Sequence, residues 1–143
     1  MIIRQLSVFL ENKPGRLSAA VDVLAKNKVN ISALSLADTA EYGVLRLIVD
    51  QPDKAKEVLS QTGVIVSITQ VSAVAMEDVP GGASSVLHSL SEAGLNIEYM
   101  YAFVGRVSGK ALTVLRTDDV GKTEEILEQN GYSHVNPADV YRL

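Results

Sequence analysis

The chain has 143 residues, a formal net charge of −4 and a pI of about 5.1, which disfavours nucleic acid as a partner because such surfaces usually need a basic stripe. Cysteine is absent, which excludes disulfides, thiolate metal sites and a cysteine nucleophile. No apolar run reaches the length of about 18 residues that a membrane span needs. Residues 1–5 lack the pattern of a signal peptide. We therefore expect a soluble, cytoplasmic protein without a membrane partner.

The first half of the chain predicts the order β-α-β-β-α-β. Residues 3–10 alternate between apolar and polar side chains, as in a half-buried strand. Apolar residues then recur at helical spacing over residues 17–27. Pro52 predicts the start of a second helix, because proline's missing N–H costs nothing in a first helical turn. The remaining predicted strands are residues 29–38, 43–49 and 64–68.

The second half repeats this order. We predict helices over residues 83–93 and between Asp118 and Gly131, and strands over residues 71–76, 96–104, 110–116 and 140–143. Residues 64–76 contain neither glycine nor proline, so no flexible linker is expected between the halves. The predicted domains are residues 1–70 and 71–143.

Matching turn residues recur at one spacing. Pro14-Gly15 returns as Pro80-Gly81 after 66 positions (81 − 15), and Asn30-Ile31 returns as Asn96-Ile97 at the same distance. Gly43 and Gly109 also match at this spacing. Such a period indicates one module used twice. The predicted fold is α+β, with two ferredoxin-like βαββαβ modules whose helices cover one face of an antiparallel sheet.

The Pro-Gly loops are the best candidates for a binding site. Glycine lets a backbone N–H approach a ligand closely. Each loop opens a helix, whose first N–H groups and dipole favour a carboxylate. The side chain of Asn12 or Asp78 is then available for an α-amino group, so the loop offers both kinds of partner that a zwitterion needs. The copies differ, since Gly82 replaces Arg16 and Val79 replaces Lys13.

Two such units, each with a strand–(Asn/Asp)-x-Pro-Gly–helix turn and an Asn-Ile opening the second strand, resemble tandem ACT domains. The resemblance covers residues 3–143 and implies a non-catalytic, cofactor-free regulatory module that binds an amino acid. It also implies that the ligand lies between the first strand–helix loop of one unit and the second strand of its neighbour. The positions so implied are Asn12, Pro14, Gly15, Arg16, Leu17, Asn30, Ile31, Asp78, Val79, Pro80, Gly81, Gly82, Asn96 and Ile97.

Some of these residues have a structural alternative. Asn30 and Asn96 are also suited simply to ending one element and starting a strand. Tyr99 shares a strand face with Tyr101, so it either lines the ligand pocket or covers an exposed sheet or an oligomer interface. His88 and His134 have no spaced partner and do not predict a metal site.

Other functional classes fit less well. An acylphosphatase-like enzyme needs a phosphate-cradling loop with an arginine, and Arg16 occurs in one copy only. An RNA-binding βαββαβ module needs aromatic residues on its first and third strands, and residues 43–49 and 110–116 have none. The remaining alternative is an ACT pair that only assembles with an enzyme of amino-acid metabolism, without binding a ligand. Edge strands and small cores also predict a homodimer.

Overall fold

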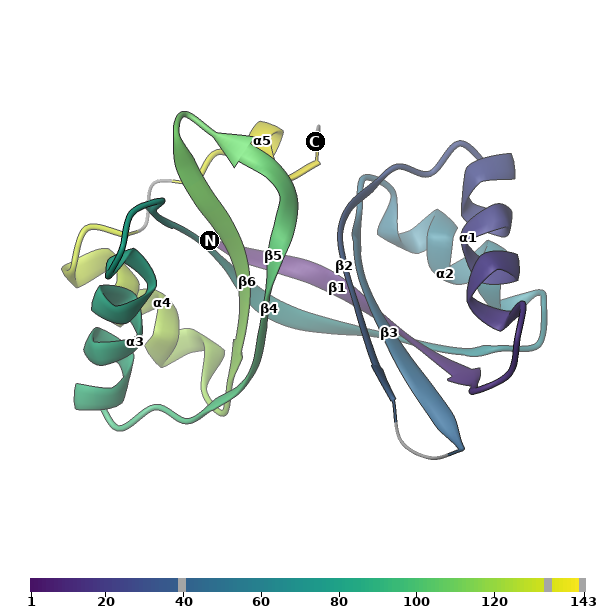
Figure 1. Cartoon of the computed structure of the whole chain (residues 1–143), viewed down its shortest axis with the longest axis horizontal. Coiled ribbons are helices and arrows are strands. Elements are labelled where there is room, and N and C mark those ends of the chain that lie inside the picture. Colours follow the sequence, from purple (N-terminus) through teal and green to yellow (C-terminus); the bar gives the residue numbers. More distant parts are fainter. Residues whose placement is uncertain (39–40, 133–134, 142–143) are drawn as a thin grey trace. The chain divides into compact units, whose positions relative to one another are not determined.

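The computed structural model describes residues 1–38, 41–132 and 135–141 of the chain. These residues form two compact units, which are shown in Figure 1. The N-terminal unit consists of Arg4–Thr69, and the C-terminal unit consists of Met1–Ile3 together with Gln70–Tyr141. The first three residues of the chain therefore belong to the same unit as its second half.

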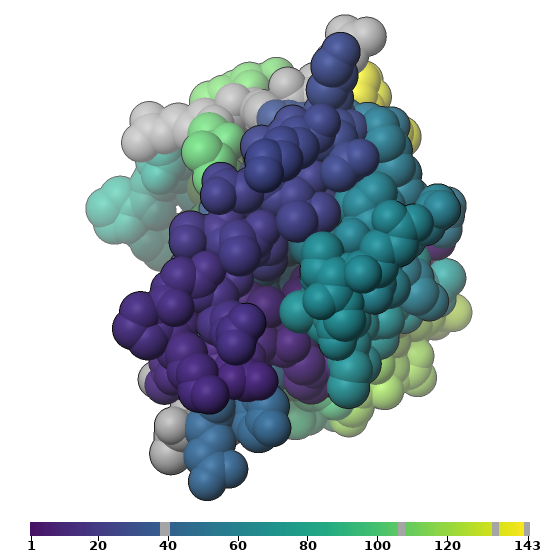
Figure 2. Space-filling view, turned by 90° about the vertical axis from the view of Figure 1, so that its right-hand side faces the viewer, coloured from purple at the N-terminus to yellow at the C-terminus, as the bar shows by residue number. Residues whose placement is uncertain are grey.

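The N-terminal unit is a four-stranded sheet covered by two helices. Its strands lie in the order β4-β1-β3-β2, and β3 is antiparallel to both β1 and β2. Helices α1 and α2 lie side by side, as Figure 2 shows. The elements are β1 (Ile2–Glu11), α1 (Arg16–Lys26), β2 (Ile31–Asp38), β3 (Tyr42–Val49), α2 (Pro52–Ser60) and the start of β4 (Ile65–Glu77).

The core of this unit follows directly from the alternation in β1. Leu6 and Val8 lie opposite Leu47 and Leu45 in the register of β1 and β3, so all four share one face of the sheet. This face is closed by buried residues of both helices, among them Leu24. The pattern thus places α1 directly above the end of β1, where the first Pro-Gly loop joins them.

The C-terminal unit repeats this arrangement, but its fourth strand comes from the beginning of the chain. Its strands lie in the order β1-β4-β6-β5, and Met1 and Ala73 exchange two backbone hydrogen bonds of 3.1 and 2.8 Å. The beginning of β1 therefore takes the place of a fourth strand. The elements are the rest of β4, α3 (Gly82–Glu92), β5 (Ile97–Val107), β6 (Lys110–Thr117), α4 (Val120–Gln129) and α5 (Pro137–Tyr141).

The predicted α+β fold of two ferredoxin-like modules is confirmed, but the predicted strand over residues 140–143 is wrong. Pro137–Tyr141 form helix α5, and the last two residues lie outside the described part of the chain. Asn136 starts this helix, since its side chain accepts a hydrogen bond of 2.9 Å from the Ala138 amide, and Pro137 suits a first helical turn. The strand position is already filled by Met1–Ile3.

Three local predictions also need correction. The separate strands predicted over residues 64–68 and 71–76 are one continuous strand, β4. Helix α4 is capped by Asp119 rather than by Asp118. Gly43 and Gly109 are not equivalent, because Leu10 pairs with Gly43 whereas its counterpart Met76 pairs with Ala111. The two added residues therefore lie before β6, and from there the copies align at 68 positions.

Gly82 is sterically required at the start of α3. A Cβ atom at this position would collide with the carbonyl oxygen of Glu77, whereas a Cβ at Gly121 would only touch the Asp119 carboxylate at 3.5 Å. We expect Gly82→Ala to lower the free energy of unfolding by about 1–3 kcal/mol, the usual cost of overpacking. Urea unfolding measures this change.

Gly121→Ala is the matched control, because it adds the same methyl group in the first turn of α4. It should leave stability unchanged or raise it by up to about 1 kcal/mol through helix propensity. Equal effects of the two substitutions would contradict the steric argument.

A buried hydroxyl pair distinguishes the two cores. The Thr117 and Thr123 hydroxyls lie 2.6 Å apart, and Thr123 donates to the Asp119 carbonyl at 2.8 Å. Val49 and Ala55 occupy the matching positions of the N-terminal unit and are fully buried. We expect Thr123→Ala to cost about 1–3 kcal/mol, since it leaves a buried hydroxyl without its partner.

The double variant Thr117→Val/Thr123→Ala reproduces the apolar pair of the other unit. It should be more stable than Thr123→Ala alone, because no hydroxyl is then left unpaired. Denaturant unfolding of all four members of the cycle measures the coupling free energy. Simple additivity of the two single substitutions would show that the hydroxyl contact contributes nothing.

Candidate functional site

The first Pro-Gly loop is an exposed turn between β1 and α1. The Asn12 amide donates to the Glu41 carbonyl at 3.0 Å, and the Arg16 amide donates to the Lys13 carbonyl at 3.3 Å. Gly15 has a φ of +84° and no side chain caps α1, so the first helical turn relies on backbone acceptors alone. Glycine is the residue suited to this left-handed conformation. The start of α1 thus presents first-turn amides beside an exposed loop.

The second loop repeats this backbone path. Gly81 has a φ of +89°, again without a side-chain cap on the following helix. The Gly82 amide donates to the Val79 carbonyl at 3.0 Å, and Gly82 itself is buried against the end of β4. Asp78, Val79 and Pro80 are exposed. Both predicted loops therefore have the same conformation at their left-handed glycine.

The charges beside the two loops differ. Glu11 forms ion pairs with Lys13 at 3.0 Å and with Arg16 at 3.7 Å. Its counterpart Glu77 forms an ion pair with Lys110 at 3.0 Å. The hydrogen bond from Lys13, helped by the charges of Lys13 and Arg16, lowers the pKa of the Glu11 carboxyl below its ordinary value. Glu11 is therefore anionic at neutral pH.

The two Asn-Ile positions are held by matching backbone bonds. The Asn30 amide donates to the Asp50 carboxylate at 2.9 Å, and the Asn96 amide donates to the Asp118 carboxylate at 3.1 Å. The amides of these aspartates donate back to the carbonyls of the same asparagines, at 3.2 Å in each case. Both asparagines thus have a structural role, in which their backbones join the start of one strand to the end of the next.

Within one unit the loop and the Asn-Ile position lie at opposite ends of the sheet. Glu11, next to the first loop, pairs with Tyr42 at the beginning of β3, whereas Ile31 pairs with Val49 at its end. The same holds for Glu77 and Ile97 in the C-terminal unit. No unit brings its own two predicted groups together, and the placement of a ligand between one loop and the neighbouring unit stays a prediction.

Two other predicted positions have defined neighbours. Leu17 is half-buried and packs against the core of the N-terminal unit, so it holds the end of the loop against that core. Tyr99 lies opposite Arg116 in the register of β5 and β6, on the same face as Tyr101. Met100 lies on the other face, opposite the core residue Leu115.

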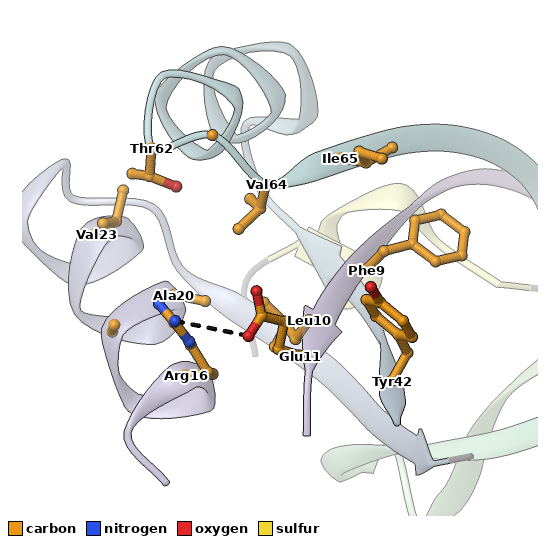
Figure 3. Close-up of a pocket in the computed structure, with 12 residues that line it drawn as sticks. Phe9, Leu10, Glu11, Arg16, Ala20, Val23, Tyr42, Thr62, Val64 and Ile65 are labelled. Carbon is orange, nitrogen blue, oxygen red and sulfur yellow. Dashed lines mark ion pairs between the residues drawn. The ribbon is translucent and has the colours of Figure 1, made fainter. Parts of the chain in front are cut away.

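A pocket of about 410 Å³ lies in the N-terminal unit beside the first loop (Figure 3). It is bounded by the end of β1, one face of α1 and the turn between α2 and β4. Of the predicted binding residues, only Arg16 lines it. Its lining residues are Phe9, Leu10, Glu11, Arg16, Ala19, Ala20, Val23, Tyr42, Thr62, Gly63, Val64 and Ile65.

Sequence reasoning missed this pocket because most of its walls are apolar residues at ordinary core spacing. The available signal was a size difference between the copies. Ala20 corresponds to Val86, and Val64 corresponds to the larger Tyr132. Tyr132 packs against the core of the C-terminal unit. At these two positions, the smaller residue of the N-terminal copy indicates unfilled space.

Two other classes of site find no support in the described residues. Over residues 1–38, 41–132 and 135–141, no three histidine or acidic side chains gather as metal ligands. His88 is exposed on α3, and His134 lies outside the described residues. In the same ranges, none of the helices combines the length and the apolar character needed to cross a membrane.

Solved structures with the same fold place the chain among known proteins. It is similar to protein BT0572 from Bacteroides thetaiotaomicron, with 41% identity and a TM-score of 0.91 over 100% of this chain and 98% of that one. It shares its fold with the aspartate kinase regulatory subunit from Thermus thermophilus, with 13% identity and a TM-score of 0.64 over 90% and 96%. It also shares its fold with the regulatory subunit of aspartate kinase from Thermus flavus, with 13% identity and a TM-score of 0.63 over 90% of this chain and 94% of that one.

A search of curated proteins gave no match. The family comparison, in contrast, covers residues 1–143 with a match described as an ACT domain pair. The two matching loops, the two ferredoxin-like units and this match over the whole length agree with one another. The chain therefore belongs to the family of ACT domain pairs.

Proposed function

We propose that this chain is a non-catalytic, cytoplasmic regulatory module that binds an amino acid at its Pro-Gly loops. The observation that carries the proposal is the repeated loop conformation, with left-handed Gly15 and Gly81 opening two helices that no side chain caps. The first-turn amides favour a carboxylate. Asn12 and Asp78, exposed in the same turns, provide oxygen acceptors for an ammonium group.

The proposed ligand-binding residues remain those of the sequence pattern. They lie in the two loops and at the two strand starts, namely Asn12, Pro14, Gly15, Arg16, Leu17, Asp78, Val79, Pro80, Gly81, Gly82, Asn30, Ile31, Asn96 and Ile97, with Tyr99 beside the last pair. Because the side chains of the two loops differ at Arg16 and Gly82, the two sites should differ in affinity. No cofactor is part of this proposal.

We also propose an enzyme of amino-acid metabolism as a protein partner. The support is the shared fold with two proteins described as regulatory subunits of aspartate kinase. Assembly with such an enzyme does not require a ligand. A chain that only assembles, and that binds no amino acid, is therefore the second candidate function.

A screen of the purified chain against the twenty amino acids separates these functions. A ligand at 100 times its dissociation constant should stabilise the protein by about 2.7 kcal/mol, which raises the melting temperature by several degrees. Differential scanning fluorimetry measures this shift. No shift with any amino acid would leave the assembly-only function.

Alanine substitutions then test the loops. We expect Asn12→Ala and Asp78→Ala each to weaken binding of the amino acid found in the screen about tenfold, the worth of one lost polar contact. Gln129→Ala, which removes an exposed amide from α4, is the control. Unchanged affinity in both loop variants, measured by isothermal titration calorimetry, would exclude the loops as the binding site.

The proposed homodimer has its best support on β2. Leu34 and Leu36 are 43% and 50% exposed, although they share a sheet face with the core residues Leu47 and Leu45. Apolar side chains exposed on a strand favour association. We expect a dimer at micromolar concentration in sedimentation velocity, and a shift toward monomer for Leu34→Ser/Leu36→Ser. A monomeric wild-type chain would contradict the proposal.

A further inference from the structure

The pocket of the N-terminal unit has an apolar interior. Leu10 and Ala20, which are 4% and 6% exposed, lie at its base, and Val23 and Val64 form half-buried walls. Figure 3 shows these side chains turned toward the same space between α1 and the turn before β4. A volume of about 410 Å³ lies within the range of small-molecule sites. The interior therefore suits an apolar group of modest size.

One side of the pocket carries both charges. Arg16 and Glu11 face each other across its edge in Figure 3, with 3.7 Å between the guanidinium nitrogen and the carboxylate oxygen. Glu11 also pairs with Lys13 at 3.0 Å. A carboxylate has about four acceptor sites, and the Arg16 and Glu11 side chains are 56% and 46% exposed, so each keeps hydrogen-bonding capacity for another partner. A carboxylate next to Arg16 and an ammonium group next to Glu11 would each meet an opposite charge.

The turn after α2, which lines the pocket, is hydrogen-bonded differently from the matching turn after α4. After α4, the Tyr132 amide donates to the Leu127 carbonyl at 2.8 Å, five residues back. After α2, the matching Leu59 carbonyl accepts instead from the Thr62 amide at 3.0 Å and from the Thr62 hydroxyl at 2.6 Å. In the described part of the chain, the Val64 amide makes no bond of the Tyr132 kind.

Two of the matching positions in the C-terminal unit hold larger side chains, whereas Val23 is matched there by the smaller Ser89. Val86 and Tyr132 stand where the pocket has Ala20 and Val64, and both pack in the core of that unit. The helix start differs too, since Gly82 lies against the Glu77 backbone where Arg16 reaches over the pocket. The N-terminal copy thus combines the two smaller residues, Ala20 and Val64, with the positive charge of Arg16.

We propose that this pocket binds an α-amino acid with an aliphatic or aromatic side chain. The apolar group lies among Leu10, Ala20, Val23 and Val64, while the α-carboxylate faces Arg16 and the α-ammonium group faces Glu11. The inference rests on the proposed amino-acid binding and adds to it a class of side chain and a second location. It requires only the N-terminal unit.

Titration of the full chain with L-leucine, L-phenylalanine and L-aspartate tests this assignment. Calorimetry should detect L-leucine or L-phenylalanine but not L-aspartate. Val64→Tyr, which copies Tyr132, should weaken that binding at least tenfold. Val104→Tyr adds the same ring at a position 62% exposed on β5 and should leave binding unchanged. If Val64→Tyr fails to fold, Ala20→Val, which copies Val86, replaces it.

Arg16→Gln tests the orientation of the ligand. This substitution should weaken the binding of L-leucine at least tenfold. The weaker binding of leucinamide, which lacks the carboxylate, should stay unchanged. Equal losses for both compounds would overturn the assignment of Arg16 to the carboxylate.

The outcomes separate this inference from the proposed function. Retained affinity in Val64→Tyr and Ala20→Val, with loss in Asn12→Ala or Asp78→Ala, would place the ligand in the loops and overturn the pocket only. Binding restricted to polar or charged amino acids would do the same. If no amino acid binds the wild-type chain, both proposals fail.

Discussion

The backbone pairing of the chain's first residues with β4 is the constraint on which the C-terminal unit depends. Met1 and Ala73 exchange two hydrogen bonds, and Met1–Ile3 belong to the same compact unit as Gln70–Tyr141. Strand β4 likewise begins in one unit and ends in the other. Each sheet is therefore completed by a strand that continues from the other unit. Because β4 would otherwise leave a row of backbone groups unpaired at the sheet edge, the C-terminal half of the chain does not form its full sheet without Met1–Ile3.

The duplication preserved the backbone but not the packing. Gly15 and Gly81 have nearly the same φ, and Asp50 and Asp118 make the same bonds to an asparagine backbone. These features fix where helices start and strands join, so they tolerate little change. The side chains between α1 and the α2–β4 turn do not determine where helices start or strands join, so they can differ between the copies. One copy fills this space with Val86 and Tyr132, and the other leaves it open.

This difference gives the two units different chemistry within one fold. Both offer helix N-termini beside exposed loops, which suits a carboxylate. The N-terminal unit adds an apolar pocket edged by an arginine and a glutamate. In the C-terminal unit, the corresponding glutamate pairs with Lys110 from β6, and Gly82 contributes no charge. The proposed ligand sites of the two units should therefore differ in affinity.

The sequence by itself determined the modules, because their signals are local. Alternation in β1, helical spacing in α1 and α3 and the recurring Pro-Gly turn are each encoded within about a dozen residues. They were enough to predict the α+β class, the duplication and the loops that open the helices. Tertiary structure decided what depends on partners far away in the chain. It gave Met1–Ile3 the strand position predicted for residues 140–143, where Asn136 and Pro137 start a helix instead. It also formed the pocket, whose walls come from β1, α1 and the turn before β4, and the periodicity of a sequence does not show that these segments meet.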